Sequence, residues 1–222
     1  MKLGILAESP ADEAAVRLLV EAVLKTPTDP VPAHPRLRHR GWPAVRLVLP
    51  AALKFLHYRT EAYGLIVVVD SNHAPVFEEG EVTDASGTRT VAADCRSRLL
   101  VNDAARILPQ LGTRLHGQRI RLAVGLCIPT IEAWLLCGRA PGVNEAAWLN
   151  GLRNRKDPYT RRDLKTRLYD SDRPPLALET QVMKEEARRV GCDIGALEQS
   201  FPYGFGSLAK ELRSWRAGIE GH

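Results

Sequence analysis

One unbroken apolar run, Leu65–Val69, constrains the fold of this chain more than any other sequence feature. A half-buried strand alternates apolar and polar residues, whereas a continuous run rich in β-branched residues is typical of a strand covered on both faces. Gly64 precedes the run and Asp70 ends it. The segment Gly64–Val69 is therefore predicted to be a central strand of a parallel sheet.

Two further apolar runs, Leu3–Ala7 and Ile120–Ile128, also predict strands. Ser9, a favoured N-cap residue, follows the first run and precedes a proline and a helical apolar pattern. Thr130 is placed to cap another helix after the second run. Strands and helices alternate in this way to about residue 138, which predicts an α/β fold: a Rossmann-like parallel sheet with helices on both faces.

The segments around the central strand are predicted from turn residues and short apolar runs. Thr26–Pro43 contains five prolines and is predicted to be a loop. Val45–Leu49 is predicted to be a strand, and Ala51–Ala62 a helix. Ala74–Arg89 is acidic and rich in turn residues, which indicates a small hairpin, and a long helix is predicted from there to about Leu111.

The character of the chain changes after Gly138, where no further strong strand pattern is found. Helical patches are predicted near Asn144–Arg153, Arg161–Tyr169, Leu178–Val190 and Gly206–Trp215. Arg153–Arg167 holds seven Lys or Arg against two Asp, a surplus of five that equals the net charge of +5 for the whole chain. The chain is thus divided into an α/β core, 1–138, and a basic helical extension, 139–222.

Several classes of protein are disfavoured. Leu122–Ile128 is the longest apolar run and falls short of the about 20 residues of a membrane span, so no membrane partner is expected. Leu3–Ala7 is too short for a signal peptide. The four cysteines lack CxxC spacing, which disfavours a zinc or redox motif. Reduced thiols and a cytoplasmic location are expected.

Three acidic residues follow predicted strands: Glu8, Asp70 and Glu132, each 62 positions from the next. Since the carboxyl ends of parallel strands share one edge of the sheet, these carboxylates are expected to cluster there, where Mg²⁺ would offset their repulsion. Simpler interpretations stay open. Glu8 and Glu132 also suit helix N-termini, Asp12 suits a capping box, and Asn72 is a common turn residue.

These residues resemble a bacterial family of uncharacterised TOPRIM-like domains related to the overcoming-lysogenization-defect nucleases. The resemblance spans most of the chain and is carried by Glu8–Glu13, Asp70–Asn72, Ile131–Leu136, Lys156–Pro158 and Ser207–Trp215. It implies a TOPRIM-type fold and cleavage of nucleic-acid phosphodiesters that depends on Mg²⁺ or Mn²⁺. It further implies a role beside an ATPase partner in bacterial defence.

The resemblance also implies roles for individual residues. Glu8 would act as general base or acid, Asp70 and Asn72 would bind the metal, and Glu132 would complete the metal site. Two positions depart from the family pattern, because Ser9 replaces a glycine and Asn72 replaces the second aspartate of a D-x-D motif. Asparagine brings no negative charge, so metal affinity should fall. A weakened module that binds nucleic acid or a protein partner is the alternative to a nuclease.

Two basic stretches could contact a nucleic-acid backbone. The first places Arg36, Arg38 and Arg40 near Trp42, and the second places Arg161, Arg162 and Lys165 near Tyr159. Cations beside an aromatic ring suit phosphate contact combined with base stacking. An ordinary solvated surface is the alternative for either stretch. No P-loop is present, and the G-x-G-x-x-A at Gly204 follows no apolar strand, so nucleotide binding of these two kinds is excluded.

Overall fold

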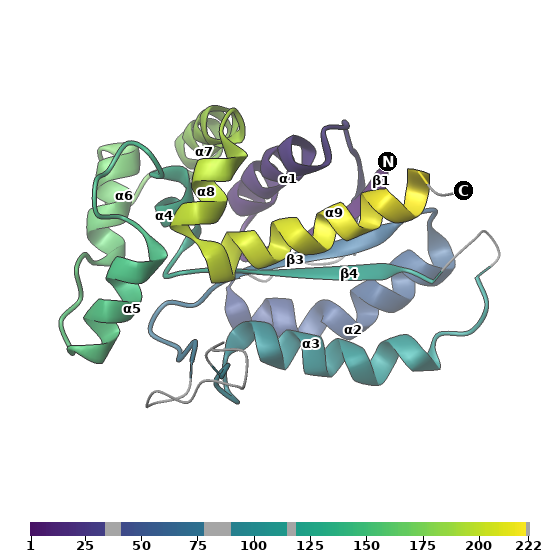
Figure 1. Ribbon diagram of the computed structural model, residues 1–222. Coiled ribbons are helices and arrows are strands. Elements are labelled where there is room, and N and C mark those ends of the chain that lie inside the picture. Colours follow the sequence, from purple (N-terminus) through teal and green to yellow (C-terminus); the bar gives the residue numbers. More distant parts are fainter. Residues whose placement is uncertain (34–40, 78–89, 115–118, 221–222) are drawn as a thin grey trace.

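The centre of the protein is a parallel four-stranded sheet in the order β2-β1-β3-β4 (Figure 1). The structure is a computed structural model and describes residues 1–33, 41–77, 90–114 and 119–220. The strands are β1 (Lys2–Leu6), β2 (Asp29–Pro32), β3 (Gly64–Asp70) and β4 (Arg121–Cys127). The predicted α/β class with a Rossmann-like parallel sheet is confirmed.

The predicted central strand lies in the interior of the sheet. All seven residues of β3 are buried, and β3 pairs with β1 on one side and β4 on the other. A strand in this position has no face in contact with water, which explains why its sequence is apolar throughout rather than alternating.

Helices cover both faces of the sheet. Figure 1 shows α1 (Pro10–Leu24) and α9 (Ser207–Glu220) on one face, and α2 (Trp42–Arg59) and α3 (Arg96–Ile107) on the other. Two glycines allow the close approach. A Cβ on Gly4 would lie 2.5 Å from Leu56 of α2, and one on Gly64 would lie 2.6 Å from Trp215 of α9.

The part of the chain that follows β4 is helical. Its elements are α4 (Ile131–Leu135), α5 (Glu145–Arg153), α6 (Arg161–Tyr169), α7 (Leu176–Gly191), α8 (Ile194–Ser200), the π-helical turn η2 (Pro202–Gly206) and α9. A short 3₁₀ turn, η1 (Leu108–Gln110), ends α3. Helix α7 packs along α1, and α9 returns across the sheet to end near the N-terminus (Figure 1). No helix among the described residues has the length and apolar character needed to cross a bilayer.

Two local predictions are wrong. Val45–Leu49 is not a strand but part of the 18-residue helix α2, which continues through Pro50. Its buried residues recur at helical spacing, so packing against the sheet outweighs the strand propensity of a five-residue run. Within the predicted loop Thr26–Pro43, Asp29–Pro32 forms β2. Its two prolines are tolerated because β2 is an edge strand.

The remaining local predictions have mixed outcomes. Helix α8 was not anticipated, because its seven residues are too few for a clear periodic pattern. The helix predicted to reach Leu111 is shorter, since α3 ends at Ile107 and η1 follows. Most of the predicted hairpin, 78–89, lies outside the described residues.

Candidate functional site: a carboxylate cluster at the ends of the strands

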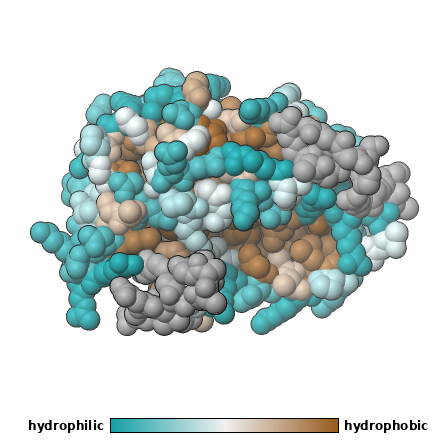
Figure 2. All heavy atoms as spheres, in the orientation of Figure 1, coloured by the Kyte–Doolittle hydropathy of each residue, from teal (hydrophilic) through white to brown (hydrophobic). Residues whose placement is uncertain are grey.

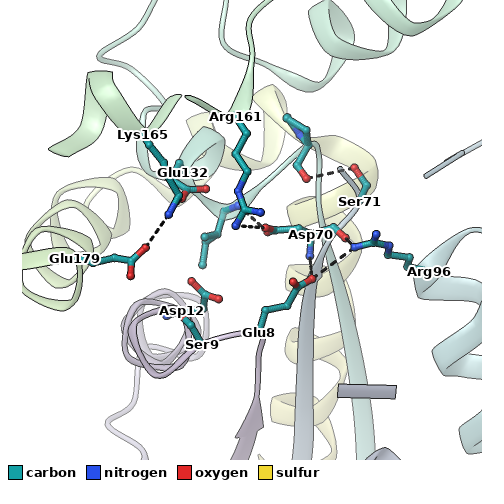
Figure 3. Close-up of polar contacts among 12 residues, drawn as sticks. Glu8, Ser9, Asp12, Asp70, Ser71, Arg96, Glu132, Arg161, Lys165 and Glu179 are labelled. Carbon is teal, nitrogen blue, oxygen red and sulfur yellow. Dashed lines mark hydrogen bonds and ion pairs between the residues drawn. The ribbon is translucent and has the colours of Figure 1, made fainter. Parts of the chain in front are cut away.

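Four carboxylates lie together at the carboxyl end of the sheet (Figure 3). Glu8 follows β1, Asp70 is the last residue of β3, and Glu132 lies in the first turn of α4. The fold thus brings together the three acidic residues that the sequence placed at one edge. Asp12, in the first turn of α1, is the fourth member. Ser9 caps α1, since its Oγ accepts a hydrogen bond of 3.1 Å from the Asp12 N–H, and the place of Asp12 in this cap hid its membership of the cluster.

Glu8 is held by two groups from neighbouring elements. The backbone N–H of Asp70 donates to Glu8 Oε1 at 3.0 Å, and Arg96 Nη1 lies 3.6 Å from the same oxygen. Arg96 also donates to the Asp70 carbonyl at 2.7 Å, and its guanidinium lies over the Trp42 ring. The side chain of Glu8 is 13% exposed. Its position is therefore fixed by β3, α2 and α3 together.

The Asp70 carboxylate is buried and has two different partners. Oδ1 accepts a hydrogen bond of 3.0 Å from the N–H of Ile131, which begins α4. Oδ2 lies 3.8 Å from Arg161 Nη2. Burial raises the pKa of Asp70 well above its usual range, and the charges of Glu132, Glu8 and Asp12 act in the same direction. Arg161 opposes this rise in pKa only in part.

Glu132 is 3% exposed, and one of its two carboxylate oxygens has a charged partner. Its Oε1 lies 3.7 Å from Lys165 Nζ, and Lys165 also donates to Glu179 Oε1 at 3.1 Å. Its Oε2 is buried and has no hydrogen-bond partner within the part of the chain that the structure describes. An unpaired buried carboxylate oxygen is costly, so it marks a place where a further ligand would stabilise the protein.

Asp12 is a carboxyl group of the cluster whose pKa lies near neutrality. Burial raises its pKa from 3.8 to about 7, with Glu132 the next contributor, and hydrogen bonding to Ser9 lowers it in part. Carboxyl groups buried against like charges hold protons more tightly, as here. A cluster of this kind is typical of functional sites, because a carboxylate pKa near neutrality suits proton transfer and cation binding.

The predicted nucleic-acid contacts fall in different places. Arg161 and Lys165 point into the cluster (Figure 3), and the side chain of Lys165 is only 18% exposed. Arg162 faces outward, with a side chain that is 78% exposed and pairs with Asp172 at 3.0 Å. The other three predicted contacts, Arg36, Arg38 and Arg40, lie outside the described residues.

Asn72 occupies a left-handed turn position with φ of +49°. Its backbone N–H donates to the Pro129 carbonyl at 2.8 Å, which ties the end of β3 to the loop before α4. Asparagine tolerates this conformation better than most residues. The structure thus supplies a local conformational reason for Asn72 that is separate from its predicted role as a metal ligand.

The donor set of the cluster suits a hard divalent cation, because Mg²⁺ prefers carboxylate oxygens and Glu132 Oε2 has no hydrogen-bond partner among the described residues. The carboxylates are not, however, already arranged around a metal position. Among the described residues, no group of three or more His, Cys, Asp or Glu side chains is positioned to hold a metal ion. In the structure, Arg161 and Lys165 supply the positive charge that balances Asp70 and Glu132. A cation would therefore have to displace these two side chains from Asp70 and Glu132.

Comparisons of the chain with protein-family models, with curated proteins and with solved structures gave no match. The chemistry of the site is therefore inferred from the contacts, burial and charge of its own residues.

Proposed function

We propose that the carboxylate cluster is the active site of a Mg²⁺-dependent phosphodiesterase that acts on nucleic acid. The observation that supports it most is the burial of Asp70 and Glu132 against like charge, with one Glu132 oxygen that no described residue hydrogen-bonds. A fold gains no stability from carboxylates crowded in this way. A divalent cation at this point would offset both the repulsion and the unpaired oxygen, as would Mn²⁺ in its place.

In this proposal, some residues of the cluster would bind the metal and Glu8 would transfer a proton. Asp70 and Glu132 would hold the metal, with Asn72 as a neutral oxygen donor, and the bound ion would polarise a phosphate oxygen. Glu8 is held by Asp70 N–H and Arg96 through Oε1, while Oε2 lies beside Gly41, which has no side chain. Glu8 Oε2 is the oxygen that would take a proton from an attacking water.

Two arginines beside the carboxylates suit the phosphate of the substrate. Arg161 lies 3.8 Å from Asp70 Oδ2, and Arg96 lies 3.6 Å from Glu8 Oε1. Guanidinium groups bind phosphate oxygens through paired hydrogen bonds. If Asp70 held a metal, Arg161 would be released from this ion pair and would be available to a phosphate. The same exchange of partners would couple metal binding to substrate binding.

A second candidate function is a binding module that keeps the fold without catalysis. It is favoured by the absence of a ready-made metal-binding group among the described side chains and by the turn role of Asn72. In this case Arg161 and Lys165 would stay paired with the cluster permanently. Nucleic acid or a protein would then bind on outward-facing cations such as Arg162.

The wider setting is proposed on the resemblance to TOPRIM-like domains. It comprises an accessory role beside an ATPase partner in bacterial defence. All four cysteines are free, and three of them are buried, which agrees with the proposed cytoplasmic location.

A cleavage assay tests the proposed activity. Labelled single- and double-stranded DNA and RNA would be incubated with the protein over a titration of Mg²⁺ or Mn²⁺. Glu8→Gln and Asp70→Asn should abolish cleavage, while Glu198→Gln, which breaks a surface pair with Arg213, should retain it. Cleavage that is equal in all four proteins would exclude this site, and a wild type that binds nucleic acid without cleaving it would favour the binding module.

A further inference from the structure

The strand β4 forms one edge of the sheet and leaves part of its backbone unpaired. The N–H of Arg121 donates to Tyr63, and the carbonyl of Cys127 accepts from Ser71, so alternate residues from Arg121 to Cys127 face β3. In a parallel strand the two polar groups of a residue point to the same side. The groups of Leu122, Val124 and Leu126 therefore point away from the sheet.

The turn η2 covers only one end of this edge. A Cβ on Gly204 would lie 2.4 Å from the Leu126 carbonyl oxygen, so η2 lies directly against Leu126. No described residue forms a backbone hydrogen bond with the outer groups of Leu122 or Val124. Two N–H groups and two carbonyls thus remain open, and such an edge is a template for another strand.

The open part of the edge lies in an apolar hollow of about 600 Å³ between α3 and α9. Figure 2 shows apolar residues gathered in this region, below the polar outer surface of α9. The α3 side includes Val101 and Ala105, one helical turn apart, and Val101 is 49% exposed. The α9 side includes Glu211, and the strand contributes Arg121. The hollow therefore combines a strand edge, an apolar helix face and one charge of each sign.

We propose that a second copy of this chain docks on this edge, with the two β4 strands antiparallel about a two-fold axis at Ala123. This register places Leu122 opposite Val124 of the other copy. Residues opposed in this way exchange two hydrogen bonds, so the two symmetric pairs satisfy every open group of both strands. The product is one continuous sheet made from both four-stranded sheets.

The helices make a second copy a better occupant than an isolated peptide. A peptide would gain only the few backbone bonds of a short edge, whereas a copy also brings its own α3 and α9. Since the axis is perpendicular to the sheet, α3 meets α3 through Val101 and Ala105. A two-fold contact must be self-complementary, and the opposite charges of Arg121 and Glu211 on the same hollow allow each to face the other.

Sedimentation equilibrium over low to high micromolar concentrations tests this proposal. The wild type should be in a monomer–dimer equilibrium. Val124→Pro removes an outward N–H that β3 does not use, so the fold should survive while the dimer Kd rises at least about tenfold. Circular dichroism would check the fold of this variant.

Charge reversal at the proposed dimer contact gives a second, independent test. Arg121→Glu should weaken the dimer, and Arg121→Glu combined with Glu211→Arg should restore it. Leu47→Glu alters another apolar residue, 77% exposed and outside the hollow, and should leave the dimer Kd unchanged. A wild type that is monomeric at every concentration would overturn the proposal, as would a dimer that withstands both Val124→Pro and Arg121→Glu.

Discussion

The backbone N–H of Asp70 donates a hydrogen bond of 3.0 Å to the side chain of Glu8, across 62 positions of sequence. The bond joins the end of β3 to the residue that follows β1, and the two strands are neighbours in the sheet. In the proposed mechanism, this bond occupies Glu8 Oε1 and leaves Oε2 as the oxygen that would take a proton.

Asp12→Asn should make stability less dependent on pH. The pKa of Asp12 is about 7 in the folded protein against an ordinary 3.8, so between these pH values the folded state binds the additional proton. The contribution of Asp12 to stability should therefore fall as pH rises from about 4 to about 7 and then level off. Asp12→Asn removes this loss.

Urea unfolding at pH 5 and pH 8 measures the effect. At pH 8 Asp12→Asn should be more stable than the wild type by about 4 kcal/mol, and the difference should shrink towards pH 4. Asp172→Asn, which alters a surface carboxylate paired with Arg162, serves as the control. A constant difference between pH 5 and pH 8 would mean that Asp12 titrates normally.

Lys165→Met should destabilise the protein strongly, because it leaves Glu132 and Glu179 without their shared cation. Loss of one partner from a buried pair costs about 3 kcal/mol at neutral pH. Arg162→Met is the matched control on the same helix, and its exposed pair should contribute less than about 1 kcal/mol. Both values come from urea unfolding at pH 7, and equal losses would show that Lys165 does not neutralise the cluster.

Asn72→Asp should raise divalent-cation affinity at least about tenfold, because it adds a charged oxygen two residues after Asp70. Any cleavage should then need less metal. Aspartate also tolerates the left-handed turn, so the fold should be kept. The comparison is a Mg²⁺ titration of cleavage for both proteins, and unchanged metal dependence would assign Asn72 to the turn alone.

Arg162→Gln should reduce the salt dependence of nucleic-acid binding if this outward-facing cation contacts a phosphate. Removal of one phosphate contact lowers the slope of log K against log salt by about 0.9 for duplex DNA. Asp172→Asn keeps the cation and removes its partner, so it should leave the slope at least as steep. A slope that does not change in Arg162→Gln would place nucleic acid elsewhere.

The strands whose sequences carry a strong signal could be predicted. The continuous run of β3 indicated a strand covered on both faces, and all of its residues are buried. Val45–Leu49 is also mostly apolar, with Arg46 as its one charged residue, yet it belongs to α2, because a run of five cannot distinguish a strand from a buried helical segment. The strand β2 was hidden by prolines that only an edge position tolerates.

The candidate site could likewise be predicted only in part from the sequence. Glu8, Asp70 and Glu132 could be placed together because parallel strands end at one edge of the sheet. Their partners could not be predicted, because Arg96, Arg161 and Lys165 reach the cluster from helices whose packing has no local signature. Lys165 was therefore interpreted as a surface cation, although its side chain is mostly buried.

Direct metal binding tests the central claim that the carboxylate cluster holds a divalent cation. Calorimetric titration with Mn²⁺ compares the wild type with Asp70→Asn, which keeps the shape of the side chain and removes its charge. Asp103→Asn, which breaks a surface pair with Arg46, is the control. We expect the wild type and Asp103→Asn to bind Mn²⁺ in competition with Mg²⁺, and Asp70→Asn to lose binding. Equal binding by Asp70→Asn, or no binding by the wild type at millimolar Mn²⁺, would contradict the claim.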